Sequence, residues 1–385
     1  MSSLIPSHLF YIADSVKSFE PKDSSITTVA GRKISYDNLV VAAGLQTNWN
    51  AIQGLTKALA DPNSGVSSVY SYDTADKVWS DVQALRSGRA IFTQPAGIIK
   101  CAGAPQKVMW MAWSTWENIL KSGSNIKTEF YTGMPTMFAV PKYSQALDEL
   151  RVRRGIEAGF GHNLVSVDSA TRKAAFKKGD GSIVEKEYTL LHAVPPMGPL
   201  DVIKGSPIAD AAGWVNVDKN TLRHVEYGNV WSLGDSSSLP TSKTAAAITA
   251  QAPVLAENLF RVTDAGSSLK ASYDGYTSCP VSTRAFPSTA PESLPQPAAS
   301  CRTRGVDTRG VQIWARTQRD FRQVSRRPSQ ASKVRVSGNP LPLPADRGTR
   351  EYYHLKKDIF PFVYWNYMLQ GRWFGPKGVA RPDFA

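Results

Sequence analysis

The chain has 385 residues, 42% of them hydrophobic and 20% charged, so it is long enough for two or three domains with sizeable cores. This composition excludes collagen, a coiled coil and wholesale disorder. The net charge of +13 is concentrated in residues 281–350, where 12 Arg and one Lys against three Asp and one Glu give +9. No run of 18 apolar residues occurs, so no membrane-spanning helix is predicted.

The chain contains three cysteines, Cys101, Cys279 and Cys301, which are too few for a small secreted disulfide scaffold. No C-x-x-C motif occurs and the five histidines are scattered, so no metal site is predicted. The first residues, MSSLIPSHLF, lack the pattern of a signal peptide or a transit segment.

Strands are predicted first, at 26–31 and 34–43. The second ends in the apolar run LVVAA just before Gly44. Buried strands of a parallel sheet end in this way at the edge where ligands bind. The alternative is an ordinary core strand that ends in a turn glycine. The elements that follow are a helix at 68–87, a strand at 89–93, the loop QPAGIIKCAGAP, a helix at 106–121, a strand and loop at 127–140, a helix at 143–158, a β-meander at 162–193 that turns at 179–181 and ends in a strand at 189–194, a strand at 230–233 and a helix at 244–262.

The composition changes after residue 280. Residues 281–350 are rich in Ser, Pro, Arg, Gln and Thr with no sustained period, which indicates a linker or disordered segment. A basic segment of this kind could also bind nucleic acid or anionic lipid. Aromatic residues return in the tail, among them Phe360, Phe362 and Trp365, with lysines and arginines around them. This pattern suits either a membrane interface or a helix that packs on a core.

A strand that ends in Gly234-Asp235 and leads into a helix at Thr244 is a candidate ligand site. No G-x-G-x-x-G fingerprint occurs in the chain. Glycine lets the backbone approach a ligand closely, and Asp235 could accept hydrogen bonds from a sugar-like hydroxyl chain. Lys243 and the helix N-terminus would attract an anionic ring or phosphate. The alternative is a turn with a capping aspartate.

Cys101 lies just before a predicted helix, between Lys100 and Lys107, and both features favour a reactive thiolate. Cys279 lies in a loop next to Pro280. Either cysteine could instead be a small buried hydrophobic residue. Their spacing in the chain does not show whether they meet. If they do, they could cycle between disulfide and dithiol, with a flavin taking the electrons.

Long stretches of the chain resemble the mitochondrial type of sulfide:quinone oxidoreductase. The similarity runs through residues 1–280 and 351–377, and its most specific combination is CAGAPQK (101–107), GD-x-x-x-LPTSKTAAA (234–247) and DGYTSCP (274–280). The resemblance implies an α/β fold of two Rossmann-like (FAD/NAD(P)-binding type) domains, the first incomplete, with a C-terminal membrane-docking tail. The implied parts are a remnant of the FAD-binding domain at 1–48, a second Rossmann-like domain at 49–190, a return to the first at 191–280, a non-matching and disordered segment at 281–350 and an amphipathic tail at 351–385.

The same resemblance implies oxidation of hydrogen sulfide by Cys101 and Cys279. Hydrosulfide would attack the bridged cysteines and leave a persulfide on Cys279, and the freed Cys101 thiolate would donate to the flavin C4a position. The sulfur would pass to glutathione, sulfite or coenzyme A, and two electrons would pass from FAD to ubiquinone. The implied location is the surface of the mitochondrial inner membrane, with no nucleic-acid partner. The residues matching the family's flavin site are Val16, Gly44, Gly234, Asp235, Lys243 and Thr244, and Phe360, Phe362 and Trp365 are candidates for quinone or membrane contact.

Two departures from the family pattern bear on activity. The family begins with a strand and a G-x-G-x-x-G turn that hold the FAD pyrophosphate, and this sequence starts after that point. Residues 281–350 do not match the family either, so their charge is read as accidental. The alternative function is therefore an inactive flavoprotein fragment or paralogue unable to hold FAD.

Overall fold

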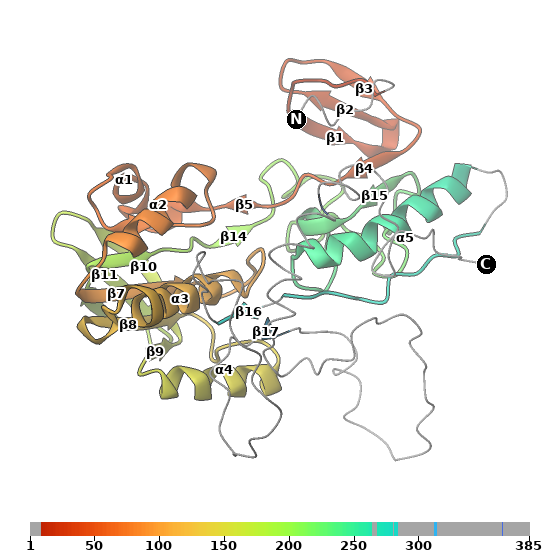
Figure 1. Cartoon of the computed structure of the whole chain (residues 1–385). Helices are drawn as coiled ribbons and strands as arrows, with labels where there is room; N and C mark the ends of the chain where they lie inside the picture. Colours follow the sequence, from red (N-terminus) through yellow and green to blue (C-terminus); the bar gives the residue numbers. More distant parts are fainter. Residues whose placement is uncertain (1–8, 264–267, 280, 284–311, 314–363, 365–385) are drawn as a thin grey trace, which may run out of the picture.

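The computed structural model describes residues 9–263, 268–279, 281–283, 312–313 and 364, and within these ranges the fold is α/β (Figure 1). The helices are α1 (Leu55–Ala60), α2 (Tyr72–Ala84), α3 (Ala104–Thr115), α4 (Pro141–Arg153) and α5 (Ala245–Thr263). The strands are β1 (Val16–Glu20), β2 (Ser25–Thr28), β3 (Lys33–Ser35), β4 (Leu39–Val41), β5 (Gln46–Thr47), β6 (Val66–Ser67), β7 (Gly88–Gln94), β8 (Ile126–Thr132), β9 (Glu157–Phe160), β10 (His162–Asp168), β11 (Lys173–Lys178), β12 (Ile183–Glu187), β13 (Leu190–His192), β14 (Met197–Gly198), β15 (Val230–Ser232), β16 (Val281–Ser282) and β17 (Gln312–Ile313).

The larger unit is a three-layer arrangement around a parallel sheet of order β6-β13-β7-β8-β9. Alternate residues of the central strand β7 face opposite layers, as the period of two in a strand requires. Phe92 packs with α2, α3 and α4, whereas Ile91 packs with α1 and the antiparallel meander β10-β11-β12. Both faces of the sheet are therefore buried, which is the usual condition of a parallel sheet.

The smaller unit is built on the parallel pair β4–β15. The antiparallel sheet β1-β2-β3 lies on one side of this pair in Figure 1, and α5 lies on the other. Its core joins distant parts of the chain, because Phe19 and Val41 pack with Trp231 and Tyr273. The two units are connected by two short segments that pair as β5 and β14. The division into domains at 48, 190 and 280 stays a prediction.

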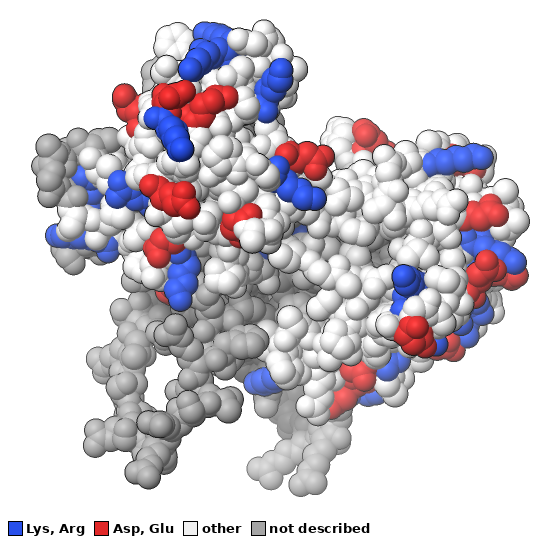
Figure 2. Space-filling model, turned by 180° about the vertical axis from the view of Figure 1, so that it is seen from behind, with Lys and Arg blue, Asp and Glu red and all other residues white. Residues whose placement is uncertain are grey.

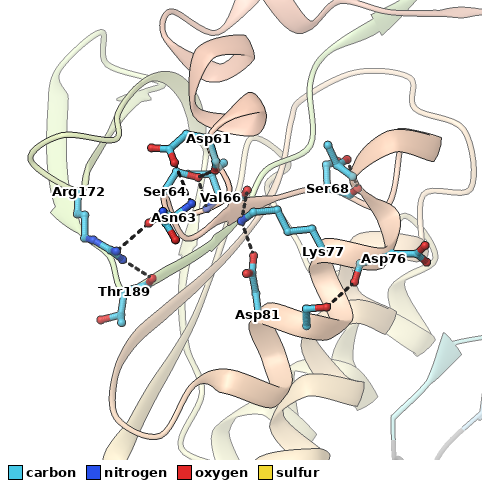
Figure 3. Close-up of polar contacts among 12 residues, drawn as sticks. Asp61, Asn63, Ser64, Val66, Ser68, Asp76, Lys77, Asp81, Arg172 and Thr189 are labelled. Atoms are coloured by element: carbon cyan, nitrogen blue, oxygen red, sulfur yellow. Dashed lines mark hydrogen bonds and ion pairs between the residues drawn. The ribbon is translucent and has the colours of Figure 1, made fainter.

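Polar contacts hold β6 and the segments next to it in place (Figure 3). Lys77 of α2 donates to the Val66 carbonyl over 3.1 Å and pairs with Asp81 over 2.9 Å. Arg172 donates to the carbonyls of Asn63 and Thr189, each over 3.0 Å. The Lys77 contacts connect α2 to β6, the two elements that flank the loop from which Tyr70 reaches the candidate site described below.

Most predicted elements form within a few residues of their expected bounds, but two differ. The strand expected at 34–43 is two strands, β3 and β4, because the polar residues between them let β3 pair with β2 and β4 with β15. The strand expected at the end of the meander, β13, pairs instead between β6 and β7. Its residues Leu190 and Leu191 are both buried, which is typical of a central parallel strand rather than of a half-exposed meander.

The described structure continues for a few residues beyond position 280. Val281 is fully buried in the core formed by α3 and its neighbours, and Arg154 donates to the Thr283 carbonyl over 2.6 Å. Two further residues of the segment 281–350 form β17, which pairs with β16. The rest of that segment, and Phe360, Phe362 and Trp365 in the tail, lie outside the described residues.

Candidate active site

Two sulfur atoms that are 178 positions apart in the chain meet where the two units face each other. The Sγ atoms of Cys101 and Cys279 lie 3.4 Å apart. Cys101 lies in the loop between β7 and α3, and Cys279 follows Tyr273 of the smaller unit. A disulfide bond requires about 2.05 Å between the sulfurs, so the structure has two free thiols. A displacement of little more than 1 Å would therefore join them.

The backbone at Cys101 is held in an unusual conformation by bonds from both units. Its φ of +50° lies in the left-handed region, which costs a non-glycine residue of order 1–3 kcal/mol. Its N–H donates to the Lys243 carbonyl over 2.7 Å. The Tyr70 hydroxyl donates to the carbonyls of Lys100 and Cys101 over 3.0 and 3.4 Å. Burial raises the pKa of Tyr70, so this hydroxyl keeps its proton and stays a donor.

Positive charge and a helix N-terminus lie next to the Cys101 sulfur. The Lys107 Nζ is 3.4 Å from the Sγ atom, and α3 begins at Ala104. Both favour negative charge on that sulfur. The other flanking lysine, Lys100, lies over the Tyr70 ring at 6.0 Å from its centroid. Of the two lysines noted in the sequence, Lys107 is thus the one placed against the sulfur.

Cys279 is more enclosed than Cys101, with an exposed fraction of only 5%. Its hydrogen bond with Cys101 and its burial raise the pKa of the Cys279 thiol, while Lys107 acts in the opposite direction. The close approach of Cys279 depends on Gly103, because a Cβ atom at that position would lie 2.7 Å from the Cys279 sulfur. No residue pattern around Gly103 had indicated this packing role.

The Gly234-Asp235 turn follows β15 at the carboxyl end of the parallel pair β4–β15. Gly234 has a φ of +70°, and Gly44, after β4, has a φ of +80°. The Oδ1 atom of Asp235 is buried and has no hydrogen-bond partner among the described residues. Burial raises the pKa of Asp235, whereas Lys243 and Lys100 lower it. A buried carboxylate oxygen without a donor is an acceptor available for a ligand hydroxyl.

Lys243 and Thr244 lie between this turn and the cysteines. The Lys243 ammonium donates to the Ser237 carbonyl over 2.5 Å and lies 4.2 Å from the centroid of the Trp214 ring. Burial lowers the pKa of Lys243 to about 8. The Thr244 hydroxyl bonds to that of Thr277, two residues before Cys279, over 2.8 Å. One short segment therefore contacts both cysteine loops, since the Lys243 carbonyl also accepts the Cys101 N–H.

A small pocket opens beside these residues, with about 160 Å³ of empty space. Its lining is Gly234, Asp235, Leu239, Thr241, Ser242, Lys243, Thr244, Ala247, Ile248 and Gln251. The acceptor on Asp235, the helix N-terminus and the Lys243 ammonium fit the polar requirements of a flavin. This space is partly open to solvent, so the lining residues form one side of a site rather than an enclosed cavity.

Val16, the other described candidate, is not among the residues that line this pocket. Val16 begins β1 and packs at the edge of the core that also contains Trp231. Its backbone pairs with that of Thr28 in β2. Within the described ranges, no three His, Cys, Asp or Glu side chains are grouped so as to hold a metal ion. The helices in those ranges are also too short or too polar to cross a bilayer.

The comparisons with known proteins agree with this geometry. A scan against models of protein families found no match. Sulfide:quinone oxidoreductase, mitochondrial, of Schizosaccharomyces pombe is 42% identical over 389 residues, covering 100% of this chain and 77% of the relative. The proteins of the same name from Dictyostelium discoideum and Mus musculus are 40% and 36% identical, covering 98% and 97% of this chain and 75% and 74% of their own lengths.

Solved structures support the fold alone, because their sequence identities are low. A chain in the cryo-EM structure of the Tetrahymena thermophila mitochondrial ATP synthase matches with a TM-score of 0.65 and 24% identity, covering 74% of this chain and 70% of that chain. The sulfide:quinone oxidoreductase of Aquifex aeolicus matches with a TM-score of 0.55 and 15% identity, covering 66% and 60%. By its fold and its relatives, the chain belongs to the mitochondrial type of the sulfide:quinone oxidoreductase family, whose members are flavoprotein oxidoreductases.

Proposed function

We propose that this chain oxidises hydrogen sulfide and passes the electrons through FAD to ubiquinone. The observation that carries the proposal is the 3.4 Å separation of the Cys101 and Cys279 sulfurs beside Lys107. Two thiols at this distance can form a disulfide with little movement, and a disulfide is the electrophile that hydrosulfide attacks. The names of the relatives support sulfide and a quinone as the two substrates.

In the sulfur chemistry, hydrosulfide attacks the Cys279 sulfur of the disulfide. A new sulfur–sulfur bond forms on Cys279, the bond to Cys101 breaks, and Cys101 leaves as a thiolate. Lys107 holds positive charge next to the sulfur that takes the negative charge. A thiolate or sulfite then attacks the outer sulfur of the Cys279 persulfide, removes it and leaves Cys279 as a thiolate. Glutathione, sulfite and coenzyme A are the acceptors that we propose.

Regenerating the disulfide from two thiolates releases two electrons. Bound FAD would accept this pair from the cysteines and hand it to the quinone. Asp235 would bind a hydroxyl of the cofactor's ribityl chain, because its Oδ1 atom is buried without a donor. Gly44 and Gly234 would let the cofactor approach the ends of β4 and β15. Lys243 and the N-terminus of α5, which begins directly after Thr244, would hold positive charge toward the ring.

Three further assignments are proposals that rest on the resemblance. Val16 would present its backbone to the adenine of FAD. Phe360, Phe362 and Trp365 would contact the quinone or the lipid surface. The protein would then act as a peripheral protein of the mitochondrial inner membrane and would bind no nucleic acid. On the face in Figure 2, acidic and basic side chains of the described residues are interspersed, which is not the single-sign patch of a nucleic-acid site.

The test is the colour of the purified full-length chain and its response to sulfide. We expect a yellow protein whose visible flavin absorption bleaches when sulfide is added without oxygen, and returns when a soluble ubiquinone analogue is added. A yellow protein that sulfide does not bleach contradicts the proposed reaction.

The second candidate function is an inactive flavoprotein fragment or paralogue. The lining beside Asp235 and Lys243 favours it, because this lining is partly open to solvent and covers only one side of a ligand. The observation that separates it from the enzyme is a colourless protein that stays colourless after incubation with free FAD and gel filtration. The proposed enzyme would bind FAD under the same conditions.

The stability of the chain should report on the buried ammonium of Lys243. Burial lowers the pKa of Lys243 from an ordinary 10.5 to about 8, so the charged ammonium destabilises the folded state. This destabilisation is complete below about pH 8 and absent above about pH 10.5, where the unfolded chain has also lost the proton. We expect Lys243→Met to raise the free energy of unfolding by about 2 kcal/mol at pH 7. This increase in the free energy of unfolding should fall by more than half when the pH is raised to about 9.5. Urea unfolding at each pH measures it.

The same exchange at exposed Lys219 is the control, and it should leave stability unchanged within about 0.5 kcal/mol at each pH. If Lys243→Met raises the free energy of unfolding equally at every pH, the buried charge is not the cause. Better apolar packing of the methionine would produce that result.

A further inference from the structure

The backbone of Lys100 and Cys101 is hydrogen-bonded at all four of its polar groups. The Lys100 N–H donates to the Met197 sulfur over 3.3 Å, and the Cys101 N–H donates to the Lys243 carbonyl over 2.7 Å. The Tyr70 hydroxyl donates to both carbonyls, over 3.0 Å at Lys100 and 3.4 Å at Cys101. One side chain, that of Tyr70, therefore serves both carbonyls.

The position of this hydroxyl bears directly on the conformation of Cys101. The two carbonyls belong to the peptide groups on either side of the Cys101 Cα atom, and the angles φ and ψ describe how those groups are turned relative to each other. Cys101 has a φ of +50°, and a non-glycine residue stays in this left-handed region only when its surroundings hold it there. The same backbone angles direct the Cys101 side chain, whose sulfur lies 3.4 Å from that of Cys279.

Tyr70 is itself held in place by the loop between β6 and α2. Its N–H donates to the Ser68 hydroxyl over 3.3 Å, and the Thr74 hydroxyl donates to the Ser68 carbonyl over 2.7 Å. The N–H of the preceding residue, Val69, donates to the Nε2 atom of His192 over 3.2 Å. His192 is fully buried at the end of β13, and burial lowers its pKa to about 3, so Nε2 stays an acceptor at neutral pH.

We propose that Tyr70 is a positioning residue that holds Cys101 in its left-handed conformation and thereby sets the distance between the Cys101 and Cys279 sulfurs. Tyr70 acts through the two backbone carbonyls. His192 acts on Tyr70 through the N–H of Val69. The inference rests on the proposed function only for its consequence in catalysis.

The test is the equilibrium between the two thiols and glutathione, in the full chain and in variants. The protein dithiol gives two electrons and two protons to glutathione disulfide, which yields a protein disulfide and two glutathione thiols. Mass spectrometry after alkylation measures the oxidised fraction across glutathione buffers. Tyr70→Phe removes only the hydroxyl. His192→Phe removes the acceptor for Val69 and keeps an aromatic ring next to Phe92.

We expect Tyr70→Phe to weaken disulfide formation about fivefold, the factor for one lost hydrogen bond, which raises the midpoint potential by about 20 mV. Hydrogen exchange at the Cys101 amide should become about fivefold faster in the reduced protein. Tyr188→Phe is the matched control and should change neither quantity, because that hydroxyl is buried in another core cluster with no partner among the described residues.

The double variant tests whether His192 acts through Tyr70. His192→Phe alone should raise the midpoint potential. Adding His192→Phe to Tyr70→Phe should raise it no further, because the hydroxyl through which His192 acts is already gone. Additive shifts in the double variant would overturn the role given to His192.

A wild-type potential in Tyr70→Phe overturns the proposal. A lower unfolding temperature or faster exchange without a shift in potential does so as well, because the hydroxyl would then only stabilise the fold. If His192→Phe does not fold, Tyr70→Phe still decides the role of Tyr70. A wild-type chain that does not react with sulfide contradicts the proposed function but leaves this titration valid, because the titration needs only the two thiols.

Discussion

Cys279→Ser should abolish sulfide oxidation, with a loss of at least about 1,000-fold in the rate of quinone reduction by sulfide. Cys101→Ser should cause a loss of the same size, and the double variant should be no worse than either. The reason is that the sulfurs, 3.4 Å apart, act as one redox unit, so removing one removes the disulfide that hydrosulfide attacks. Quinone reduction followed by absorbance measures the rates.

Cys301→Ser is the matched control, and we expect it to keep wild-type activity. The single variants should stay yellow, since serine replaces sulfur without removing Asp235 or Lys243 from the pocket. A Cys279→Ser enzyme that keeps more than about a tenth of the activity would show that sulfide reaches the flavin without the cysteine pair.

Gly103→Ala should separate the two sulfurs by steric contact alone. The added Cβ would lie 2.7 Å from the Cys279 sulfur and 3.1 Å from a methyl carbon of Val281. Val281 is fully buried, so the sulfur has little room to retreat in that direction. Overpacking of this kind costs about 1–3 kcal/mol. We expect disulfide formation to weaken about tenfold or more, measured as the oxidised fraction of the two thiols across glutathione buffers, with a matching loss of activity.

The backbone of Gly103 makes this prediction specific. Its φ of −84° and ψ of −7° suit alanine, so conformational strain does not contribute. Gly179→Ala is the control, because a Cβ there meets no atom within 4 Å. If Gly103→Ala forms the disulfide as readily as the wild type, the space at Gly103 does not set the distance between the sulfurs.

Residue patterns alone predicted most of the local structure around the site. Periodicity and small-residue turns predicted α2, α3, α4 and α5 and the strand β7. The sequence also predicted a turn at Gly234-Asp235, and it singled out Cys101 because of its lysines and the helix that follows. These features depend on neighbours within about a turn of helix or a few strand residues, which a sequence displays directly.

The fold differed from prediction where pairing partners are distant in the chain. β13 follows the meander in sequence, yet it pairs with β6 and β7. β3 and β4 read as one strand, yet they belong to different sheets. A strand's partner is selected by burial and register across the whole fold, and neither quantity is written in the residues of the strand itself.

The sequence by itself determined that Cys101 precedes a helix beside lysines, and that a Gly-Asp turn precedes another helix. Resemblance to a family, not spacing, suggested that Cys101 and Cys279 form a pair. Only the tertiary structure decided that their sulfurs lie 3.4 Å apart and that Gly103 leaves room for them. The physical reason is that these contacts join residues from two units, and a distance between units exists only after both cores have formed and packed.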